Sequence, residues 1–415
     1  MRKLYIGNKL RFIKDTNRVL PKGFQEVEYL QSTGTQYIDT GFKMEDGKTM
    51  TFEGRLMWTS SNGAANFFYG YRSVNSAEYR GDMRAFFVYG QSGGGSTGRL
   101  AIRYGVNTDN STSIISQNQK YNISFDGTNL KVDGTTFINL SEAYTPANYQ
   151  NMYLFWCNCT GYYSADVAKF SGRIYNWKIW SGGVLVRDFI PCLDASNVPC
   201  IYDRVEGKAY YNQGTGSFTY GHTITPVEYL ESTGTQYIDT GVNANSNPKY
   251  ELKFVISYTN PSSPSPQYTG ADYGGTFGVV NGKWQWSNNV PVTANQFYEI
   301  DYINQNGLRG AYVNGTDYYQ GSNFASSGYR CLLFAAGQDN SGTTKTSLFS
   351  AKMKSCSIAL SDTIVRDYIP VKDENNVGYM FDRVTHTLFA NAGTGSFAVG
   401  NETTKDTLRL IKDAN

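Results

Sequence analysis

The stretch VEYLQSTGTQYIDTG, residues 27–41, decides the fold because the chain contains it twice. It returns as VEYLESTGTQYIDTG at residues 227–241, where Glu231 in place of Gln31 is the one difference. Self-similarity across 200 residues is typical of tandem domains and is too long for a solenoid of small units. The sequence therefore predicts one domain that is present in two copies.

Three further motifs mark where each copy ends. They are VRDFIP at 186–191 and VRDYIP at 365–370, YDRV at 202–205 and FDRV at 381–384, and GTGSF at 214–218 and 393–397. We place the copies at residues 24–221 and 226–400, joined by a linker of a few residues. The separation falls from 200 to 179 residues, so the first copy carries about twenty extra residues within 71–120. We expect a surface-loop elaboration around the Gly-rich segment 91–98, with a neutral insertion as the alternative.

Alternating side chains and turn pairs predict hairpins in both copies. Residues Tyr121–Phe125 alternate, an Asp-Gly pair follows, and Leu130–Val132 leads to a second Asp-Gly pair. Gly278–Trp286 has the same character around an Asn-Gly pair. No segment shows a long 3.6-residue period, Gly (43) and Tyr (33) are abundant, and only 17% of residues are charged. The sequence therefore predicts an all-β chain of two tandem antiparallel sandwiches.

The composition narrows the classes of function. A net charge of +2 excludes nucleic-acid binding driven by charge. No apolar run approaches the ~18 residues of a membrane span, and the basic start lacks the apolar segment of a secretory signal. We therefore expect no nucleic-acid partner, no membrane partner, and synthesis in a cytoplasm without a signal peptide.

Six cysteines and two histidines bear on disulfides and metals. Cys157 and Cys159 lie two apart on an expected strand, so they share a face and cannot easily bond to each other. Cys192 and Cys200 could close a loop that the second copy holds without a bridge, so we favour free buried thiols and leave this bond open. Neither histidine has a match in the other copy, so we expect no zinc site.

The two ends of the chain resemble each other, with LRFIKDTN at 10–17 and LRLIKDAN at 408–415. We expect a basic N-terminal arm at 1–23 and a C-terminal tail at 401–415 that dock on a partner by strand addition. Chance similarity of frayed tails is the alternative. The candidate docking residues are Arg11, Ile13, Lys14, Arg409, Ile411 and Lys412.

The hairpins, together with FSGRIYNWKIW at 170–180, resemble laminin-G-like, concanavalin A-like jelly-roll domains. The opening motif and the closing GTGSF motif resemble the variant common in tailed bacteriophages and prophages of gut bacteria. The resemblance covers nearly all of 24–400. It implies two antiparallel sheets in each copy, a role in adhesion or particle structure, and frequent but not universal sugar binding.

Candidate catalytic groups are sparse. Glucanases of the concanavalin A-like family use a Glu-x-Asp-x-x-Glu strand, whereas the best match here has Glu299 and Asp301 but ends in Asn304. His222 lies at the domain junction and His386 on an expected turn, which disfavours a Ser-His-Asp or Cys-His site. We therefore expect no enzymatic activity.

Five charged positions recur in both copies. They are Asp39/Asp239, Arg187/Arg366, Asp188/Asp367, Asp203/Asp382 and Arg204/Arg383. We interpret them as Arg–Asp pairs and Asp-anchored turns that hold the sandwich ends together. A ligand rim or a calcium rim is the alternative. Because no dense Asp-x-Asp loop is present, we expect no cofactor and keep calcium as an outside alternative.

Aromatic side chains are the candidates for ligand binding, because flat rings stack on sugar rings while polar side chains bind the hydroxyl groups. Exposed candidates lie near the insertion of the first copy and after Gly270, with packing of a Tyr-rich loop as the alternative. A Trp pair lies on one hairpin face that we interpret as core, with a binding groove as the alternative. The candidate ligand-binding residues are Tyr69, Tyr71, Arg72, Tyr79, Arg80, Asp272, Tyr273, Trp284 and Trp286.

The resemblance implies a non-enzymatic phage virion protein, such as a head or tail fibre, a decoration protein or a baseplate component. Its two lectin-like domains would attach to host or gut-surface glycans. We expect other virion proteins as partners through the termini, and a homo-oligomer or many copies on a symmetric particle. A glycan-binding bacterial surface adhesin is the alternative, and a glycan-cleaving enzyme is the least favoured.

Overall fold

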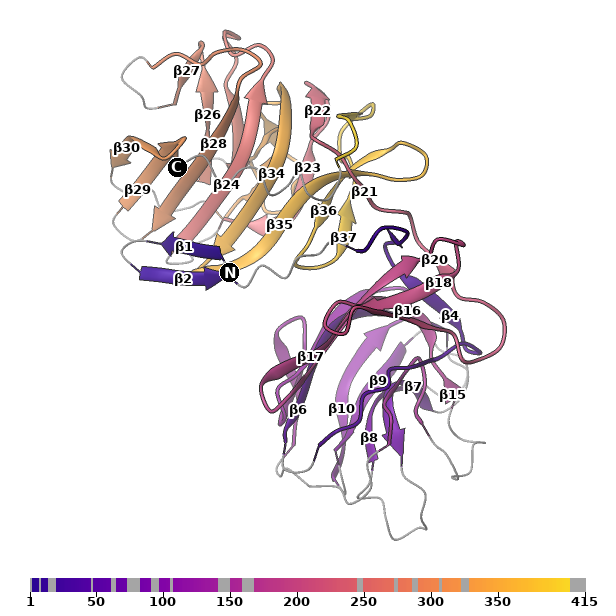
Figure 1. The fold of residues 1–415 in the computed structure, drawn as a ribbon. Coiled ribbons are helices and arrows are strands. Elements are labelled where there is room, and N and C mark those ends of the chain that lie inside the picture. Colours follow the sequence, from indigo (N-terminus) through magenta and orange to yellow (C-terminus); the bar gives the residue numbers. More distant parts are fainter. Residues whose placement is uncertain are drawn as a thin grey trace. The chain divides into compact units, whose positions relative to one another are not determined.

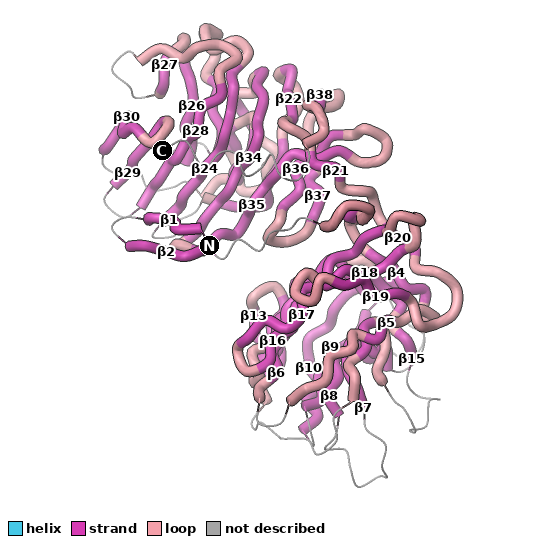
Figure 2. Tube along the Cα trace, viewed as in Figure 1, coloured by secondary structure: helices cyan, strands magenta, loops and turns pink. Residues whose placement is uncertain are grey.

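Every regular element in the described part of the chain is a β-strand, as Figure 1 and Figure 2 show. The computed structural model describes residues 2–6, 9–13, 20–45, 48–60, 65–72, 83–90, 97–104, 107–140, 150–158, 168–244, 249–271, 275–285, 290–305, 308–321 and 328–403. The chain divides into two compact units, Met1–Tyr220 (unit 1) and Gly221–Asn415 (unit 2). The predicted all-β class is confirmed.

The large sheet of unit 1 has eleven strands, and all its pairings are antiparallel. In spatial order the main path is β13 (Thr135–Asn139), β12 (Asn129–Val132), β11 (Lys120–Phe125), β6 (Met50–Ser60), β16 (Ser171–Ser181), β17 (Val184–Leu193), β18 (Pro199–Asp203) and β19 (Lys208–Tyr211). The short strands β3 (Gln25–Glu26), β4 (Leu30–Thr33) and β20 (Thr219–Tyr220) flank this path.

The smaller sheet of unit 1 has seven strands. They are β10 (Asn107–Ser116), β9 (Thr97–Tyr104), β8 (Met83–Gly90), β7 (Ala65–Arg72), β14 (Tyr153–Leu154) and β5 (Ile38–Asp39), with β15 (Ala168–Lys169) parallel to β7. Buried rings from both sheets, such as Phe52 of β6 and Phe86 of β8, belong to one hydrophobic cluster. The two sheets therefore form a sandwich with a single core.

Unit 2 is built the same way. Its large sheet runs β30 (Thr316–Gly321), β29 (Leu308–Val313), β28 (Phe297–Gln305), β24 (Lys249–Tyr258), β34 (Ser350–Leu360), β35 (Thr363–Lys372), β36 (Gly378–Asp382) and β37 (Thr387–Phe389), flanked by β21 (Thr225–Pro226), β22 (Leu230–Thr233) and β38 (Ala398–Val399). Opposite it lie β27 (Lys283–Trp284), β26 (Gly275–Val280), β25 (Gln267–Ala271), β32 (Ala336–Gly337) and β33 (Lys345–Thr346), with the pair β23 (Ile238–Asn243) and β31 (Arg330–Leu333). The large sheet matches that of unit 1 strand for strand, as the duplicated sequence predicts.

The opening and closing motifs recur because they bind each other. In unit 1 the Thr35 hydroxyl donates to the carbonyl oxygen of Thr215 (3.0 Å), and the Gln36 amide donates to that of Ser217 (3.1 Å). In unit 2 Thr235 donates to the carbonyl of Thr394 (3.1 Å). The two most recognisable motifs of the sequence thus close each sandwich.

At one paired position in the core, the large and the small residue lie on opposite strands in the two units. Trp177 on β16 lies directly opposite Gly54 on β6, whereas the equivalent pair in unit 2 is Cys356 on β34 opposite Phe254 on β24. A methyl carbon added to Gly54 would lie 2.2 Å from the Trp177 ring. Each unit therefore fills the same layer of its core with one ring, supplied from opposite strands.

The Asp-Gly and Asn-Gly pairs make the predicted hairpin turns. Asp133 (φ 47°) with Gly134 (φ 82°), and Asn281 (φ 50°) with Gly282 (φ 75°), both have two consecutive positive φ angles. That geometry matches the twist of the flanking strands.

Three strands lie within residues 71–120, the region that holds the extra length of unit 1. Residues 71–120 contain β8, β9 and β10, which pair in order and extend the smaller sheet. Leu100, Ala101 and Ile102 of β9 are buried while Arg99 is exposed, so β9 contributes to the core. The Gly-rich residues 91–96 lie outside the described residues.

The N-terminal arm contains a hairpin of β1 (Arg2–Ile6) and β2 (Lys9–Ile13). Of the candidate docking residues, Arg11 and Ile13 are on β2, and their side chains lie outside the description. Lys14, Arg409, Ile411 and Lys412 lie outside the described residues altogether.

The five described cysteines are buried free thiols, namely Cys157, Cys192, Cys200, Cys331 and Cys356. Cys192 and Cys200 face each other across β17 and β18 with their sulfur atoms 3.3 Å apart. Their burial agrees with the sequence-based expectation.

Candidate functional site

Three aromatic rings and a lysine gather on the outer face of the smaller sheet of unit 1, and we call them the Tyr37 cluster (Tyr37, Tyr153, Trp156 and Lys169). The Tyr37 and Tyr153 rings stack with centroids 5.0 Å apart, and the Trp156 ring meets Tyr37 edge-on at 5.0 Å. The Lys169 ammonium lies 4.2 Å from the Trp156 centroid. All four side chains are partly exposed, and Tyr37 also packs against the hydrophobic core.

Strand alternation points these rings outward. Tyr153 pairs with Asp39 and Leu154 pairs with Ile38, so Tyr153 and Asp39 share one face while Leu154 and Ile38 share the other. Ile38 and Leu154 are fully buried in the core, which leaves Tyr37, Asp39 and Tyr153 on the outside. The fold therefore fixes the direction of the cluster.

Polar groups border the rings. The Asn151 amide donates to both carboxylate oxygens of Asp39 (3.1 Å each), and the backbone N–H of Gly41 also donates to Asp39 (2.9 Å). The Asn158 amide donates to the carbonyl oxygen of Asn151 (3.0 Å). Rings beside a fixed carboxylate and amides are the combination that binds the apolar face and the hydroxyl groups of a sugar.

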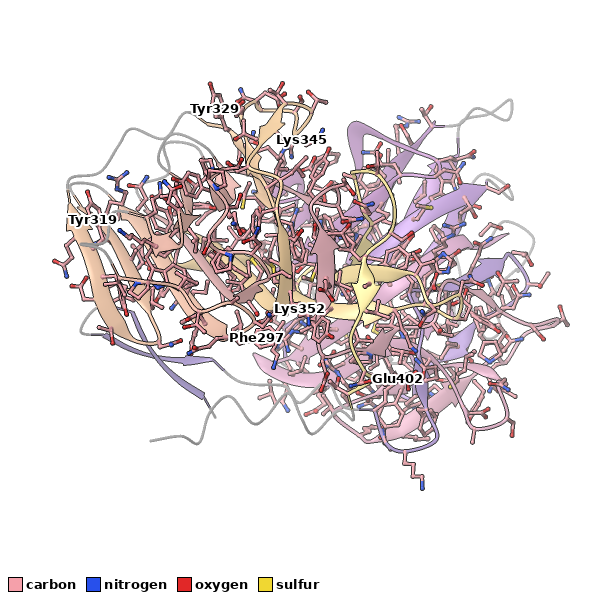
Figure 3. The ribbon with its side chains drawn as sticks, turned by 90° about the horizontal axis from the view of Figure 1, so that it is seen from above. Phe297, Tyr319, Tyr329, Lys345, Lys352 and Glu402 are labelled. Atoms are coloured by element: carbon pink, nitrogen blue, oxygen red, sulfur yellow. The ribbon has the colours of Figure 1, made fainter. Side chains whose placement is uncertain are left out.

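The equivalent surface of unit 2 is closed. Leu332 stands at the position of Tyr153 and Ala335 at that of Trp156, and both are buried. Tyr237 keeps the position of Tyr37 but is only 5% exposed and belongs to a small apolar cluster with these two residues. Lys345, labelled in Figure 3, lies 4.9 Å from its ring centroid. Unit 2 thus has one covered ring where unit 1 has three partly exposed rings.

A second set of ring–cation contacts is present in both units, on the large sheets. Arg173 lies 4.3 Å from the Tyr29 ring centroid, and Lys352 lies 4.9 Å from that of Tyr229, its counterpart in unit 2 (Figure 3). Because these contacts recur, we interpret them as part of the architecture and not as a site. The Tyr37 cluster differs because its full set of rings occurs in unit 1 alone.

Three of the five repeated charged positions, Asp188/Asp367, Asp203/Asp382 and Arg204/Arg383, form the expected architectural contacts. Arg204 pairs with Asp188 in unit 1, and Arg383 pairs with Asp367 in unit 2 (2.6 Å). Asp203 accepts from the backbone N–H groups of Asp188 (2.9 Å) and Val205 (3.0 Å), which anchors the turn after β18. Burial raises the pKa of Asp203. These groups are occupied in holding the sandwich ends together.

Asp301 on β28 and Glu251 on β24 share a lysine of β24. Lys253 lies 3.0 Å from both Asp301 and Glu251. Burial raises the pKa of Asp301 to about 6, with Lys253 opposing the shift. Asp301 therefore takes part in an ion-pair network, while Glu299 on the same strand is exposed.

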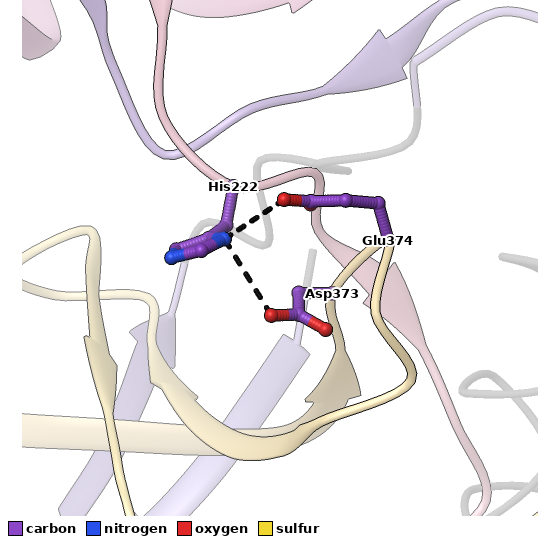
Figure 4. A group of neighbouring side chains, drawn as sticks. All are labelled: His222, Asp373 and Glu374. Atoms are coloured by element: carbon purple, nitrogen blue, oxygen red, sulfur yellow. Dashed lines mark hydrogen bonds and ion pairs between the residues drawn. The ribbon is translucent and has the colours of Figure 1, made fainter.

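His222, Asp373 and Glu374 meet where the linker joins unit 2 (Figure 4). His222 Nδ1 lies 3.0 Å from a Glu374 oxygen and 3.5 Å from an Asp373 oxygen. Asp373 also accepts from backbone N–H groups and from the Tyr379 hydroxyl, and Asp194 makes the matching contacts in unit 1. The contacts of Asp373 thus recur at Asp194, where no histidine is present. We therefore interpret the group as a structural contact that holds the linker residue His222 against unit 2.

Three of the predicted ligand-binding residues belong to the core. Tyr69 is 1% exposed, Tyr71 0% and Trp284 2%. Tyr69 and Tyr71 lie on the inner side of β7, and the Tyr69 hydroxyl contacts the sulfur atom of Met152 (2.9 Å). Trp284 stacks on Phe277 at 5.7 Å inside unit 2. The predicted ligand-binding role of Tyr69 and Tyr71 is wrong, because their rings supply core volume and cannot face a ligand. The burial of Trp284 agrees with the core interpretation of its hairpin face and excludes the binding groove.

The other predicted ligand-binding residues lie outside the description. The side chain of Arg72 is not described although its backbone is in β7. Tyr79, Arg80, Asp272, Tyr273 and Trp286 lie outside the described residues.

Sequence reasoning missed Tyr153, Trp156 and Lys169. A signal for them was present, because at the 179-residue separation they align with Leu332, Ala335 and Leu348. The exchange of aromatic and basic residues for small apolar ones within a duplicated module marks a surface that one copy exposes and the other covers. Only the strand pairing shows that these three residues meet Tyr37.

Comparison with known proteins finds likeness in structure alone. No protein-family model and no curated protein matches the chain. Among solved structures, 23 chains match. They include domains LG4–5 of the mouse laminin α1 chain (8% identity, 93% of this chain and 98% of that chain, TM-score 0.28). They also include a protein from Bacteroides ovatus described as a proposed carbohydrate-binding protein (9%, 87% and 95%, TM-score 0.33) and the LG1–3 region of the laminin α2 chain (8%, 90% and 66%, TM-score 0.27).

At identities and TM-scores this low, we infer neither family membership nor a ligand from these structures. No helix in the described part of the chain is long and apolar enough to cross a membrane.

Proposed function

We propose that this chain is a non-enzymatic recognition protein that binds glycans through the Tyr37 cluster of unit 1. The observation that carries the proposal is the platform of partly exposed rings, Tyr37, Tyr153 and Trp156, bordered by Asp39 and Asn151. The closed counterpart in unit 2 supports it, because a merely structural cluster would be expected in both copies.

Binding would combine two contributions. The apolar face of a pyranose ring stacks on the tyrosine or tryptophan rings, and the Asp39 carboxylate with the neighbouring amides binds the hydroxyl groups. A small platform of this kind gives weak binding for a single copy. Many copies on one particle would raise the effective affinity by factors of about 10²–10⁴.

The proposed setting is a phage virion, as a fibre, decoration or baseplate component. The support is the resemblance of the opening motif at 27–41 and the closing motif at 214–218 to phage jelly-roll domains, and the paired terminal segments suited to docking. Mass spectrometry of purified particles from the source phage tests this setting. Absence of the chain from intact particles would leave the bacterial adhesin as the better proposal.

A glycan array with the full chain tests the binding itself. Trp156→Ala and Tyr153→Ala each remove one ring of the platform, and we expect each to weaken binding by about tenfold or more. Tyr220→Ala is the matched control, since Tyr220 is a 44% exposed tyrosine of the same unit outside the cluster. Unchanged binding by both cluster variants, or no glycan binding at all, would contradict the proposal.

Absence of catalysis is also part of the proposal. Turnover of gut polysaccharides by the purified chain, lost on Asp301→Asn, would instead favour a glycan-cleaving enzyme. The Lys253–Asp301–Glu251 network makes an ion-pair role the expected one.

A further inference from the structure

Two guanidinium groups of unit 2 converge above Gly241, at the end of the opening motif. A methyl carbon added to Gly241 would lie 3.4 Å from Arg366 Nη2 and 3.7 Å from Arg330 Nη1. Gly241 has a positive φ (71°) and no side chain, so both nitrogens border one small space. Both arginine side chains are about one-fifth exposed, so solutes can reach this space from solvent.

Arg366 is held firmly by its other two nitrogens. Nε donates to the carbonyl oxygen of Thr240 (3.0 Å), and Nη1 donates to that of Val365 (2.8 Å). Arg187 makes the same two contacts in unit 1, at 3.3 Å and 2.8 Å. The repeat therefore fixes the guanidinium in the same place in both units, with Nη2 directed at the rim.

The third nitrogen is treated differently in the two units. In unit 1, Arg187 Nη2 lies 2.6 Å from a Glu206 oxygen, and the Tyr210 hydroxyl donates to the same carboxylate. In unit 2, Thr385 stands at the position of Glu206 and Phe389 at that of Tyr210. The carboxylate of Glu206 and the phenol hydroxyl of Tyr210 therefore have no counterparts in unit 2. The Glu206 carboxylate thus has no counterpart at Arg366 Nη2. On the Nε side both units keep an aspartate, Asp203 at 3.4 Å from Arg187 and Asp382 at 3.7 Å from Arg366.

The second arginine is also specific to unit 2. Arg330 stands where unit 1 has Asn151. Its Nε lies 3.6 Å from Asp239, and this nitrogen makes no hydrogen bond. Replacing asparagine by arginine adds one positive charge, and replacing Glu206 by threonine removes one negative charge. Both changes raise the local charge of the same rim.

We propose that Arg330 and Arg366 form a binding site for an oxyanion, the carboxylate or sulfate of an acidic saccharide. Such a group would take the place of the Glu206 carboxylate and accept charge-assisted hydrogen bonds from the two guanidinium groups. Asp239 and Asp382 are the nearby opposing charges, 3.6 Å from Arg330 Nε and 3.7 Å from Arg366 Nε, and the ligand competes with both. Binding of the isolated anionic group is therefore weak, in the millimolar range (~4 kcal/mol).

Titration of the full chain tests the site, followed by the arginine side-chain signals in ¹⁵N–¹H correlation spectra. Sodium glucuronate, sodium sulfate and neutral glucose are compared at equal ionic strength, with sodium chloride as the reference. We expect glucuronate and sulfate, but not glucose, to shift the signals of Arg330 and Arg366. Shifts with sulfate alone would support the site and assign it to sulfated ligands. Shifts no larger than those with chloride would overturn it.

Two variants built from unit 1 keep the test independent of folding failure. Arg330→Asn installs the residue of unit 1, and Thr385→Glu returns the missing carboxylate while leaving both arginines in place. We expect each to weaken anion binding by about tenfold or more. Binding that survives in both folded variants would overturn the proposal. The converse pair Asn151→Arg with Glu206→Thr should create a second anion site in unit 1.

The site does not depend on the Tyr37 cluster, because it lies in the other unit. The array variants Trp156→Ala and Tyr153→Ala and the titration variants Arg330→Asn and Thr385→Glu therefore report on separate claims, and either can fail alone.

Discussion

The exchanged pair in the two cores predicts a strong coupling between positions 54 and 177. The first perturbation is Trp177→Cys, which copies the residue of unit 2. It removes ring contacts with Phe52 (centroids 5.0 Å), Phe68 (4.8 Å) and Tyr69 (5.4 Å). Truncating a buried ring of this size costs about 3–5 kcal/mol.

The second perturbation is Gly54→Phe. A side chain at position 54 starts 2.2 Å from the Trp177 ring and 2.6 Å from the Asn176 carbonyl oxygen, so no rotamer fits while the indole is present. We expect at least about 3 kcal/mol of destabilisation from overpacking. In the double variant the new ring occupies the space that the indole leaves, as Phe254 does beside Cys356 in unit 2. The double variant should therefore lose less than the two single changes together. The approach to the Asn176 carbonyl oxygen, which loss of the indole does not relieve, sets the remaining cost.

Calorimetry and urea unfolding of the full chain measure this cycle, with the unfolding transition of unit 1 compared across wild type, both single variants and the double variant. Phe254→Gly with Cys356→Trp is the mirror test in unit 2. If the two single effects add to within about 0.5 kcal/mol in the double variant, the two positions are not coupled and our explanation of the core is wrong.

Three further predictions concern charges and thiols. Arg204→Ala should destabilise unit 1 by about 3–5 kcal/mol, because it leaves Asp188 buried without its partner. Arg383→Ala should destabilise unit 2 by at most about 1 kcal/mol, because its pair with Asp367 is about one-third exposed. Urea unfolding measures both free energies, and equal losses would contradict the role of burial. Burial raises the pKa of Asp301 to about 6, so the folded state holds this proton more tightly than the unfolded state. The contribution of the protonated carboxyl to the free energy of unfolding is therefore lost as pH rises from about 4 to 6. Asp301→Asn should flatten the pH dependence in that window, and an unchanged profile would show that another group titrates. Burial raises the pKa of the Cys331 thiol to about 12, so a thiol reagent should label Cys331 in urea but not in the folded chain, as peptide mapping by mass spectrometry will show.

The sequence carries most of the fold because the repeat supplies an internal comparison. The duplicated motifs predicted two like sandwiches, and the Asp-Gly and Asn-Gly pairs predicted the hairpin turns at Gly134 and Gly282. Strands β8, β9 and β10 within residues 71–120 were not predicted, and residues 91–96 of the glycine-rich segment lie outside the described residues. Strand β9 buries Leu100, Ala101 and Ile102 in succession, so no strict alternation marks it in the sequence.

The candidate site was harder to predict because exposure depends on which face of a strand a residue occupies. Tyr69 and Tyr71 were selected because they are aromatic residues near the insertion, but both are buried on β7. Tyr153 and Trp156 come from a strand more than 110 positions after Tyr37, and their meeting depends on the pairing of β14 with β5. The amino-acid sequence shows which residue types are present, but it does not show which distant strands pair.

The exchanged core pair also bears on how a duplicated chain avoids misassembly. Near-identical opening strands invite one copy to take the other's segment during folding, which is the usual failure of tandem domains. A hybrid sheet would place Trp177 beside Phe254, with two rings in the space of one, or Gly54 beside Cys356, with an unfilled void. A sheet that mixed central strands from the two units would therefore be less stable than either native sheet. We expect this difference to oppose domain swapping between the two homologous units.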